Sequence, residues 1–151
     1  AKAGCSIRNS YFHANGGNSK QGSYVVFIES KAGTVENCTF TENSLYGSAG
    51  SVITDNVTGS AVRNCLFVAN TRGGSAIAAN NTGSMVSGGK GERTGNLTVQ
   101  DMNDAQFAED GVTPLSTWTT VVDAGTLQDW MMGAKDLCGN PRVITARKPL
   151  E

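Results

Sequence analysis

The chain has 151 residues, of which 38% are hydrophobic and 17% charged, and a formal net charge of -1 at pH 7. This composition fits one folded globular domain and excludes a highly charged disordered segment. The 12 Lys and Arg residues are scattered, so neither nucleic acid nor an anionic membrane surface is expected as a partner. No stretch approaches the roughly 20 apolar residues that span a bilayer, and no transmembrane segment is expected.

The turn-forming residues indicate β-structure. The chain holds 19 Gly and only 3 Pro, so its turns depend on Gly and Asn, which tolerate positive φ. Frequent turns of this kind favour many short strands. Ser, Thr and Asn replace charged residues on the polar surface, which favours a location outside the cytoplasm. Because the chain begins without Met, we expect that a leader or a longer upstream segment has been removed.

An internal repeat runs through the first 70 residues. Segments 7–15, 35–43 and 62–70 align without gaps, at spacings of 28 and 27 residues. Four of their positions hold an aliphatic residue (Ile7, Val35, Val62), a first Asn (Asn9, Asn37, Asn64), Phe (Phe12, Phe40, Phe67) and a second Asn (Asn15, Asn43, Asn70). A second phrase occurs at 50–59 and 74–83, with a looser copy from Gly22. Each period therefore holds two strand-like runs separated by Asn and Gly.

The length of the period separates three repeat architectures. Leucine-rich repeats, propeller blades and coils of a parallel β-helix all combine β-runs with regular spacing. The Leu-rich frame is absent here, and a propeller blade needs about 40 residues, which exceeds the observed period. The repeat therefore predicts an all-β right-handed parallel β-helix, a solenoid in which each coil stacks in register on the previous one.

Stacking places equal positions of successive repeats in one column. We expect Asn9, Asn37 and Asn64 to form a ladder of amide-to-amide hydrogen bonds. The three Phe residues of the repeat are expected to form an interior stack. Both expectations follow from strand pairing in register.

The direction of the side chains must change within each repeat. Val35 and Phe40 are five residues apart, so a regular strand cannot point both inward. We therefore expect a bend near Asn37, after which Cys38 and Phe40 share the inner face.

The later part of the chain departs from the period. Residues 84–94 are rich in Gly, Lys, Glu and Arg and are expected to form a projecting loop before a strand resumes at Leu97; a solvated linker is the simpler alternative to a binding loop. Further on, Thr126 is expected to cap a short helix with Asp129 in a capping-box position, and Gly133 is expected to end it. We expect this helix to close the last coil as part of a C-terminal cap.

Two stretches of the chain carry a family resemblance. The repeats resemble the V-x-N-C-x-F-x-x-N phrases of bacterial secreted right-handed parallel β-helix proteins, and Phe107, PLSTWTTVVDAG at 114–125 and DLCGNPRV at 136–143 resemble the closing segment of that family. The match departs at Thr120, where the family commonly has Pro. The family's acidic-glycine-aromatic end is also missing after Pro149. The resemblance implies fold and a surface location, and it does not imply one activity, because the family includes lyases, glycosidases and proteins of no known chemistry.

The resemblance also sets the expected division of the chain. Residues 1–101 are expected to form β-helix coils, with the loop at about 84–94, and residues 102–149 the closing segment and cap. Residues 150–151 are expected to be an expression scar, unless the chain stops just short of the family's end.

Charged residues give little indication of catalysis. His13 shares its column with Thr41 and Val68, which favours an ordinary surface or turn histidine over a catalytic base. Arg8, Glu36 and Arg63 form an outward column of alternating charge. Glycosidases need two carboxylates about 5 to 10 Å apart, but Glu36 faces Arg columns and Glu42 stands alone, and a lyase base is not supplied by Lys31 and Arg63, which lie in different columns.

Metal and cofactor sites are not predicted. Asp55, Asp101 and Asp104 carry oxygen ligands that calcium accepts, but no calcium-binding motif frames them and turn capping is the favoured role. The double-glycine segments lack the strand-to-helix context of a phosphate loop. We therefore assign no catalytic, cofactor-binding or metal-binding residue and expect no cofactor.

Exposed rings are the remaining candidates for ligand contact. Tyr24, Phe27, Tyr46, Trp118 and Trp130 can stack on sugars. For the two Trp residues, packing over the open end of the core is the favoured alternative. None of the five is assigned to a site.

Four cysteines allow three full pairings. Cys38 and Cys65 share a column, where free buried thiols and a disulfide are both open. Cys5 and Cys138 lie near opposite ends of the solenoid and are not expected to pair. No C-x-x-C motif is present, which argues against thiol catalysis.

The function we expect is that of a non-catalytic module of a secreted or cell-surface bacterial protein, which binds a glycan or a protein partner. The alternative is the C-terminal part of a polysaccharide lyase or glycoside hydrolase whose catalytic coils lie upstream, and a structural spacer is a third reading. The first coil begins near Ala3 and Gly4 without a capping element. Its open N-terminal edge is therefore expected to bind upstream coils or a protein partner, with a polysaccharide as a further ligand.

Overall fold

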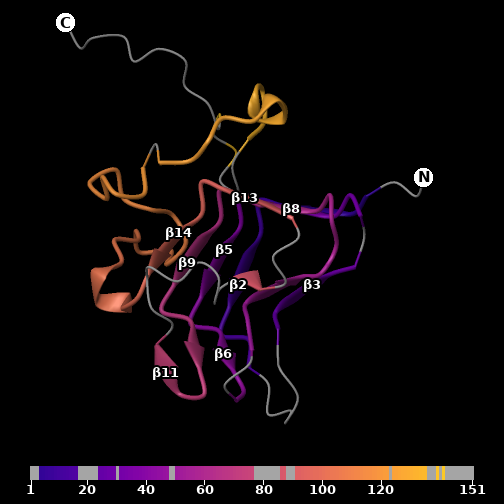
Figure 1. The fold of residues 1–151 in the computed structure, drawn as a ribbon. Helices are drawn as coiled ribbons and strands as arrows, with labels where there is room; N and C mark the ends of the chain where they lie inside the picture. Colours follow the sequence, from indigo (N-terminus) through magenta and orange to yellow (C-terminus); the bar gives the residue numbers. More distant parts are fainter. Residues whose placement is uncertain are drawn as a thin grey trace, which may run out of the picture.

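The computed structural model describes residues 4–16, 24–29, 31–47, 50–76, 86–87, 91–122, 124–135, 139 and 141 (Figure 1). Cys138, residues 150–151 and most of the expected closing phrase at 136–143 lie outside the described residues, as does most of the phrase copy at 74–83. The described part consists almost entirely of short β-strands, and it contains two single-turn 3-10 helices. None of its helices is long and apolar enough to cross a membrane.

The strands are two or three residues long. They are β1 (Ser6–Arg8), β2 (Tyr11–His13), β3 (Val26–Ile28), β4 (Thr34–Glu36), β5 (Thr39–Thr41), β6 (Ser44–Leu45), β7 (Ile53–Asp55), β8 (Ala61–Arg63), β9 (Leu66–Val68), β10 (Thr71–Arg72), β11 (Ser75–Ala76), β12 (Val86–Ser87), β13 (Glu92–Thr94) and β14 (Leu97–Val99). The 3-10 helices are η1 (Met102–Asp104) and η2 (Asp129–Met131).

Parallel pairing connects corresponding strands of successive repeats. One sheet has the order β1-β4-β8-β13, a second β2-β5-β9-β14 and a third β3-β7-β12, and all pairs within them are parallel. β6 pairs in parallel with β10, which forms an antiparallel hairpin with β11. Each repeat thus adds one strand to each of the first two sheets (Figure 1). The arrangement is all-β, mostly parallel and compatible with an all-β parallel solenoid.

The strand register confirms the alignment of the repeats. Phe40 pairs with Phe12 on one side and Phe67 on the other. The rings of these residues stack at centroid separations of 4.7 and 5.2 Å, as expected for an interior stack. A fourth repeat, which the sequence alignment did not include, places Thr98 next to Phe67 and Arg93 next to Val62. The apolar columns therefore end in polar residues at the fourth repeat.

A left-handed corner explains the first Asn of each repeat. Asn9, Asn37 and Asn64 each have φ 52°, and Gly95 occupies the same position in the fourth repeat with φ 65°. Asn and Gly are the residues that enter this conformation at least cost. The corner confirms the expected bend near Asn37, because Val35 before it and Phe40 after it are both buried.

The amide ladder lies in a different column from the expected one. Asn43 Oδ1 accepts hydrogen bonds from the backbone N–H of Asn15 at 3.0 Å and from its Nδ2 at 2.9 Å. Asn70 Oδ1 accepts the equivalent bonds from Asn43 at 3.0 and 2.8 Å. The prediction of a ladder at Asn9, Asn37 and Asn64 is therefore wrong. Asn9 and Asn64 donate instead to backbone carbonyls of the closing segment. The second Asn directly follows another left-handed residue, Ala14, Glu42 or Ala69, with φ of 50–53°, and it bonds along the stack.

Two apolar clusters stabilise the molecule. The main core lies between the three sheets and includes Val35, Cys38 and Phe40. A second cluster forms on the outer side of β9 and β14, where the closing segment covers the sheet with Trp118 and Phe107. The rings of Trp118 and Phe107 meet edge to face at 5.2 Å. Trp118 therefore packs against an outer sheet face, and the expectation that it covers the open end of the core is wrong.

The position of this cover follows from the outward residues of the second sheet. The first two repeats place polar groups such as His13 and Thr41 there, whereas the third and fourth place Leu66, Val68, Leu97 and Val99. Only the apolar half of the face needs to be removed from water.

Two expected local elements differ in the structure. The segment expected to be a loop at 84–94 contains β12 and β13, which continue the third and first sheets. The expected helix is the single turn η2, whose N-cap is Gln128 and not Thr126. Thr126 is used instead in a contact with Asn64. Gly133 follows η2 with φ 77°, consistent with its expected role as the stop.

Candidate functional site

A column of alternating charge lies on the outer side of the first sheet. Arg8, Glu36 and Arg63 pair in register on β1, β4 and β8, as expected from the sequence. Arg8 Nε is 2.7 Å from Glu36 Oε2, and Arg63 Nη1 is 2.8 Å from Glu36 Oε1. Arg63 also pairs with Glu92 of β13. The Glu36 side chain is only 1% exposed, whereas those of Arg8 and Arg63 are 41% and 22% exposed, so only the centre of the column is shielded from water.

The two arginines keep Glu36 ionised. Burial alone raises the pKa of Glu36, but the hydrogen bonds and charges of Arg8 and Arg63 outweigh burial, and the net pKa lies below the ordinary value. The hydrogen bond from Arg63 likewise lowers the pKa of Glu92. The bond with Glu92, together with that to Glu36, raises the pKa of Arg63. A carboxylate held ionised between two cations is a poor general acid or base, so this column is structural.

The closing segment returns along this sheet. Asn64 Oδ1 accepts the N–H of Thr126 and Asn64 Nδ2 donates to the carbonyl of Thr126, both at 2.7 Å. At the other end, Asn9 Nδ2 donates to the carbonyl of Lys135 at 3.4 Å, and Trp130 lies 4.5 Å from the Arg8 guanidinium. The corner asparagines thus hold residues 126–135 against the sheet, and Trp130 covers Arg8 and not the end of the core.

His13 belongs to a polar cluster on the second sheet. Thr41 Oγ1 donates to the Tyr11 hydroxyl at 2.8 Å, and the Tyr11 hydroxyl donates to the carbonyl of Gly111 at 3.2 Å. His13 Nδ1 lies 3.0 Å from Thr41 Oγ1 and 3.5 Å from Glu42 Oε2. Glu42 therefore does not stand alone, as we expected from the sequence. The column shared by His13 and Thr41 is confirmed.

This cluster fastens the closing segment to the second sheet. Its hydrogen bonds run from Thr41 through Tyr11 to the backbone at Gly111. The His13 and Glu42 side chains are about half exposed, which keeps water close to both groups. Anchoring of the closing segment is the role that the geometry of this cluster supports.

The aspartates that we considered as calcium ligands cap turns. Asp55 is fully buried, and its Oδ1 accepts from the Ser60 hydroxyl and from the Val57 N–H. Asp101 accepts from the Asn103 N–H at 2.9 Å and caps η1, which contains Asp104. No three His, Cys, Asp or Glu residues gather in a metal-binding group within the described ranges.

The described cysteines of the core form no disulfide. Cys38 and Cys65 are buried and unbridged, and Cys5 is exposed and unbridged. Cys65 Sγ donates to the carbonyl of Val35 at 3.6 Å, and in the fourth repeat Asn96 takes the next position and bonds to Val62 in the same way. Burial raises the pKa of Cys65, which keeps the thiol protonated and unreactive.

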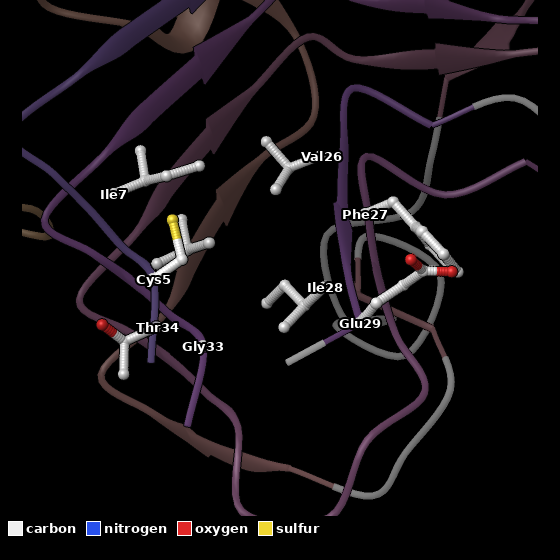
Figure 2. Close-up of a pocket in the computed structure, with 9 residues that line it drawn as sticks. Cys5, Ile7, Val26, Phe27, Ile28, Glu29, Gly33 and Thr34 are labelled. Atoms are coloured by element: carbon white, nitrogen blue, oxygen red, sulfur yellow. The ribbon is translucent and has the colours of Figure 1, made fainter. Parts of the chain in front are cut away.

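The N-terminal end of the core is open. A cavity of about 80 Å³ lies there, bordered by β1 and β3. Figure 2 shows Ile7, Val26 and Ile28 directed into this space, with Cys5 at its rim. The walls come almost entirely from apolar side chains. Within the described residues, β1, β2 and β3 each have a strand neighbour on one side only.

In the described part of the chain, the repeat columns end at this opening. Phe40 and Phe67 are fully buried, but Phe12 at the head of the same column is only partly buried. Asn15 heads the amide ladder and donates to Asn43, and its own Oδ1 has no donor among the described residues. The opening therefore exposes the same kinds of groups, a Phe ring and an Asn amide, that each repeat packs against its neighbour.

Phe27 borders the opening and belongs to a pair of exposed aromatic rings. Tyr24 and Phe27 stack at a centroid separation of 4.9 Å and are 52% and 37% exposed. Tyr46 is 41% exposed. These three were candidates from the sequence, and the structure brings Tyr24 and Phe27 together. The contact between His13 and Glu42 was missed because the sequence shows which column a residue occupies but not that diagonal neighbours meet.

Comparison of the chain with protein-family models, with curated proteins and with solved structures found no match.

Proposed function

We propose that the chain is a non-catalytic repeat module, built as a right-handed parallel β-helix, whose open first repeat binds a polypeptide layer of the same kind. That layer is either further repeats or a partner protein. The observation that carries the proposal is the N-terminal end of the columns, where an apolar cavity borders β1 and β3, and where β1, β2 and β3 each have a strand neighbour on one side only among the described residues.

The chemistry of the opening selects the partner. Each interior repeat covers its neighbour with an aliphatic residue, a Phe ring and an Asn amide, and the first repeat offers Ile7, Phe12 and Asn15 to whatever lies above it. A layer with the same phrase would bury the first two and donate to the third. The fourth repeat is a poor complement, because it holds Arg93 and Thr98 at the equivalent positions. Head-to-tail binding of a second copy is therefore disfavoured.

The proposal places this module outside the cell, in a secreted or surface-attached bacterial protein. The low charged fraction and the resemblance of the repeats support this part. The alternative, the end of a polysaccharide lyase or glycoside hydrolase, receives no support from the described carboxylates. Glu36 is held between two arginines, and Asp55 accepts a hydrogen bond from Ser60 in a buried turn.

A fusion protein tests the docking face. A copy of residues 32–58 is placed directly before Gly4, so that the copied repeat meets β1 and β2 in the observed register. We expect amide hydrogen exchange to slow in peptides covering residues 5–15 and 24–29, and the melting temperature to rise. The matched control carries V35D and F40D in the copy only.

Three outcomes are informative. Protection by the first fusion alone supports the proposal. No added protection with either fusion contradicts it. Equal protection with both fusions also contradicts it, because the columns would then not be recognised.

A further inference from the structure

The outer side of β3 carries an aromatic pair beside a carboxylate. Side chains alternate along a strand, so Val26 and Ile28 face the core while Phe27 and Glu29 face outward. Figure 2 shows Phe27 and Glu29 together on the opposite side of β3 from Val26 and Ile28. The ring of Tyr24 stacks on Phe27 with an interplanar angle of 27°. The nearly parallel rings expose a continuous apolar surface of small area.

Polar groups border these rings on the next repeat. Thr54 of β7 lies beside Phe27 in register, and the exposed Asn56 follows β7 as Glu29 follows β3. The surface therefore combines two rings with a carboxylate, a hydroxyl and an amide. None of these five side chains is basic.

We infer that this surface, formed by Tyr24, Phe27, Glu29, Thr54 and Asn56, is a subsite for a neutral saccharide. A pyranose has an apolar C–H face that matches an aromatic ring and a rim of hydroxyls that match carboxylate and amide groups. The two rings are too small for a stable protein interface, which buries about 800 Å² per partner. The Glu29 charge disfavours uronates and phosphates, which are anionic.

The subsite and the docking face lie on opposite sides of β3. The side chains of Val26 and Ile28 point into the cavity. Phe27 and Glu29 also border the cavity, but their side chains lie on the other side of β3, where they would contact the saccharide. A failure of either proposal therefore leaves the other standing.

A titration followed by NMR chemical shifts tests the subsite. The probes are cellohexaose, laminarihexaose and maltohexaose as neutral ligands and trigalacturonate as an anionic one. We expect saturable shifts at residues 24–29 and 54–56 with at least one hexaose, at a Kd of about 1 mM or below. Trigalacturonate should bind more weakly than that hexaose.

Variants distinguish binding at the subsite from nonspecific binding. Y24A and F27A should weaken binding of the hexaose at least about fivefold, which corresponds to the loss of one ring contact. Y46A, the matched control for an exposed tyrosine outside the subsite, should stay within about twofold. E29Q should strengthen trigalacturonate binding, because it removes the charge that repels the uronate carboxylates.

Other results would overturn the inference. One is that no neutral hexaose binds saturably. A second is that the native protein prefers trigalacturonate, and a third is that Y24A and Y46A lose equal affinity for the hexaose. If F27A melts at a lower temperature than the native protein, the test depends on the affinity of Y24A alone, because Tyr24 is the more exposed of the two residues and its removal disturbs the fold less.

Discussion

Replacing Glu36 by Gln removes the central charge of the Arg8–Glu36–Arg63 column and leaves the shape of the side chain. Gln offers one carbonyl acceptor, so one arginine keeps a neutral hydrogen bond and the other faces an NH₂ group. The two guanidinium groups are then like charges on either side of an uncharged residue. The variant therefore tests whether the buried carboxylate stabilises the stack.

The size of the effect follows from the exposure of the partners. A hydrogen bond to a charged group contributes about 1.5–3 kcal/mol. Glu36 makes two of them, but the Arg8 and Arg63 side chains are 41% and 22% exposed, so water compensates part of the loss. We expect E36Q to lower the free energy of unfolding by about 2–4 kcal/mol at pH 7. For a chain of this length, that lowers the melting temperature by about 4–16 °C.

The pH dependence has a definite sign. The pKa of Glu36 is lower in the folded protein than in the unfolded chain, so its contribution is complete above about pH 4.5 and is lost as pH falls through the folded-state pKa. The difference between E36Q and the native protein should therefore be largest at neutral pH and shrink in acid. Urea unfolding at pH 7, 5, 4 and 3 measures it.

The control is E29Q, which removes an exposed carboxylate that has no ion pair among the described residues and should change stability by less than about 0.5 kcal/mol. Equal stability of E36Q and E29Q at pH 7 would refute the reasoning. So would a difference between E36Q and the native protein that grows as pH falls.

Three further predictions concern the stack and its cover. F40A should lower the free energy of unfolding by about 3–5 kcal/mol, measured by urea unfolding, and F12A should lower it clearly less. Phe40 is fully buried between two rings, whereas Phe12 is partly buried and stacks on one ring. Equal losses in the two variants would contradict an open first repeat. N43D keeps an acceptor for the first repeat but loses the donors to the Phe12 carbonyl and to the third repeat, and should cost about 2–5 kcal/mol by the same assay; a neutral result would show that the ladder is dispensable. N64G keeps a left-handed corner but removes both hydrogen bonds to Thr126. Amide exchange should therefore accelerate at residues 126–135, while the free energy of unfolding falls by no more than about 1 kcal/mol. Unchanged exchange at these residues would mean that other contacts hold the segment.

The sequence by itself determined the stacking of the repeats. Because parallel strands pair residue by residue, equal spacing of equal residues was enough to predict the Phe stack and the alternating charge column. It also predicted the bend near Asn37, since two inward residues at an odd separation require a change of direction. The exposed pair of Tyr24 and Phe27 was visible as candidate rings but not as a pair.

Only the tertiary structure decided which asparagine column forms the ladder and where the closing segment lies. Both Asn columns repeat equally well in sequence. The difference is that Asn37 itself occupies a left-handed position, whereas Asn43 follows such a position and bonds to Asn70 along the stack. The fourth repeat has Arg93 and Thr98 where the others have aliphatic and Phe residues. Only the pairing of its backbone with the third repeat therefore shows that it belongs to the stack. Trp118 covers β9 and β14 because those strands face outward with apolar residues, a match between segments far apart in the chain that local spacing does not encode.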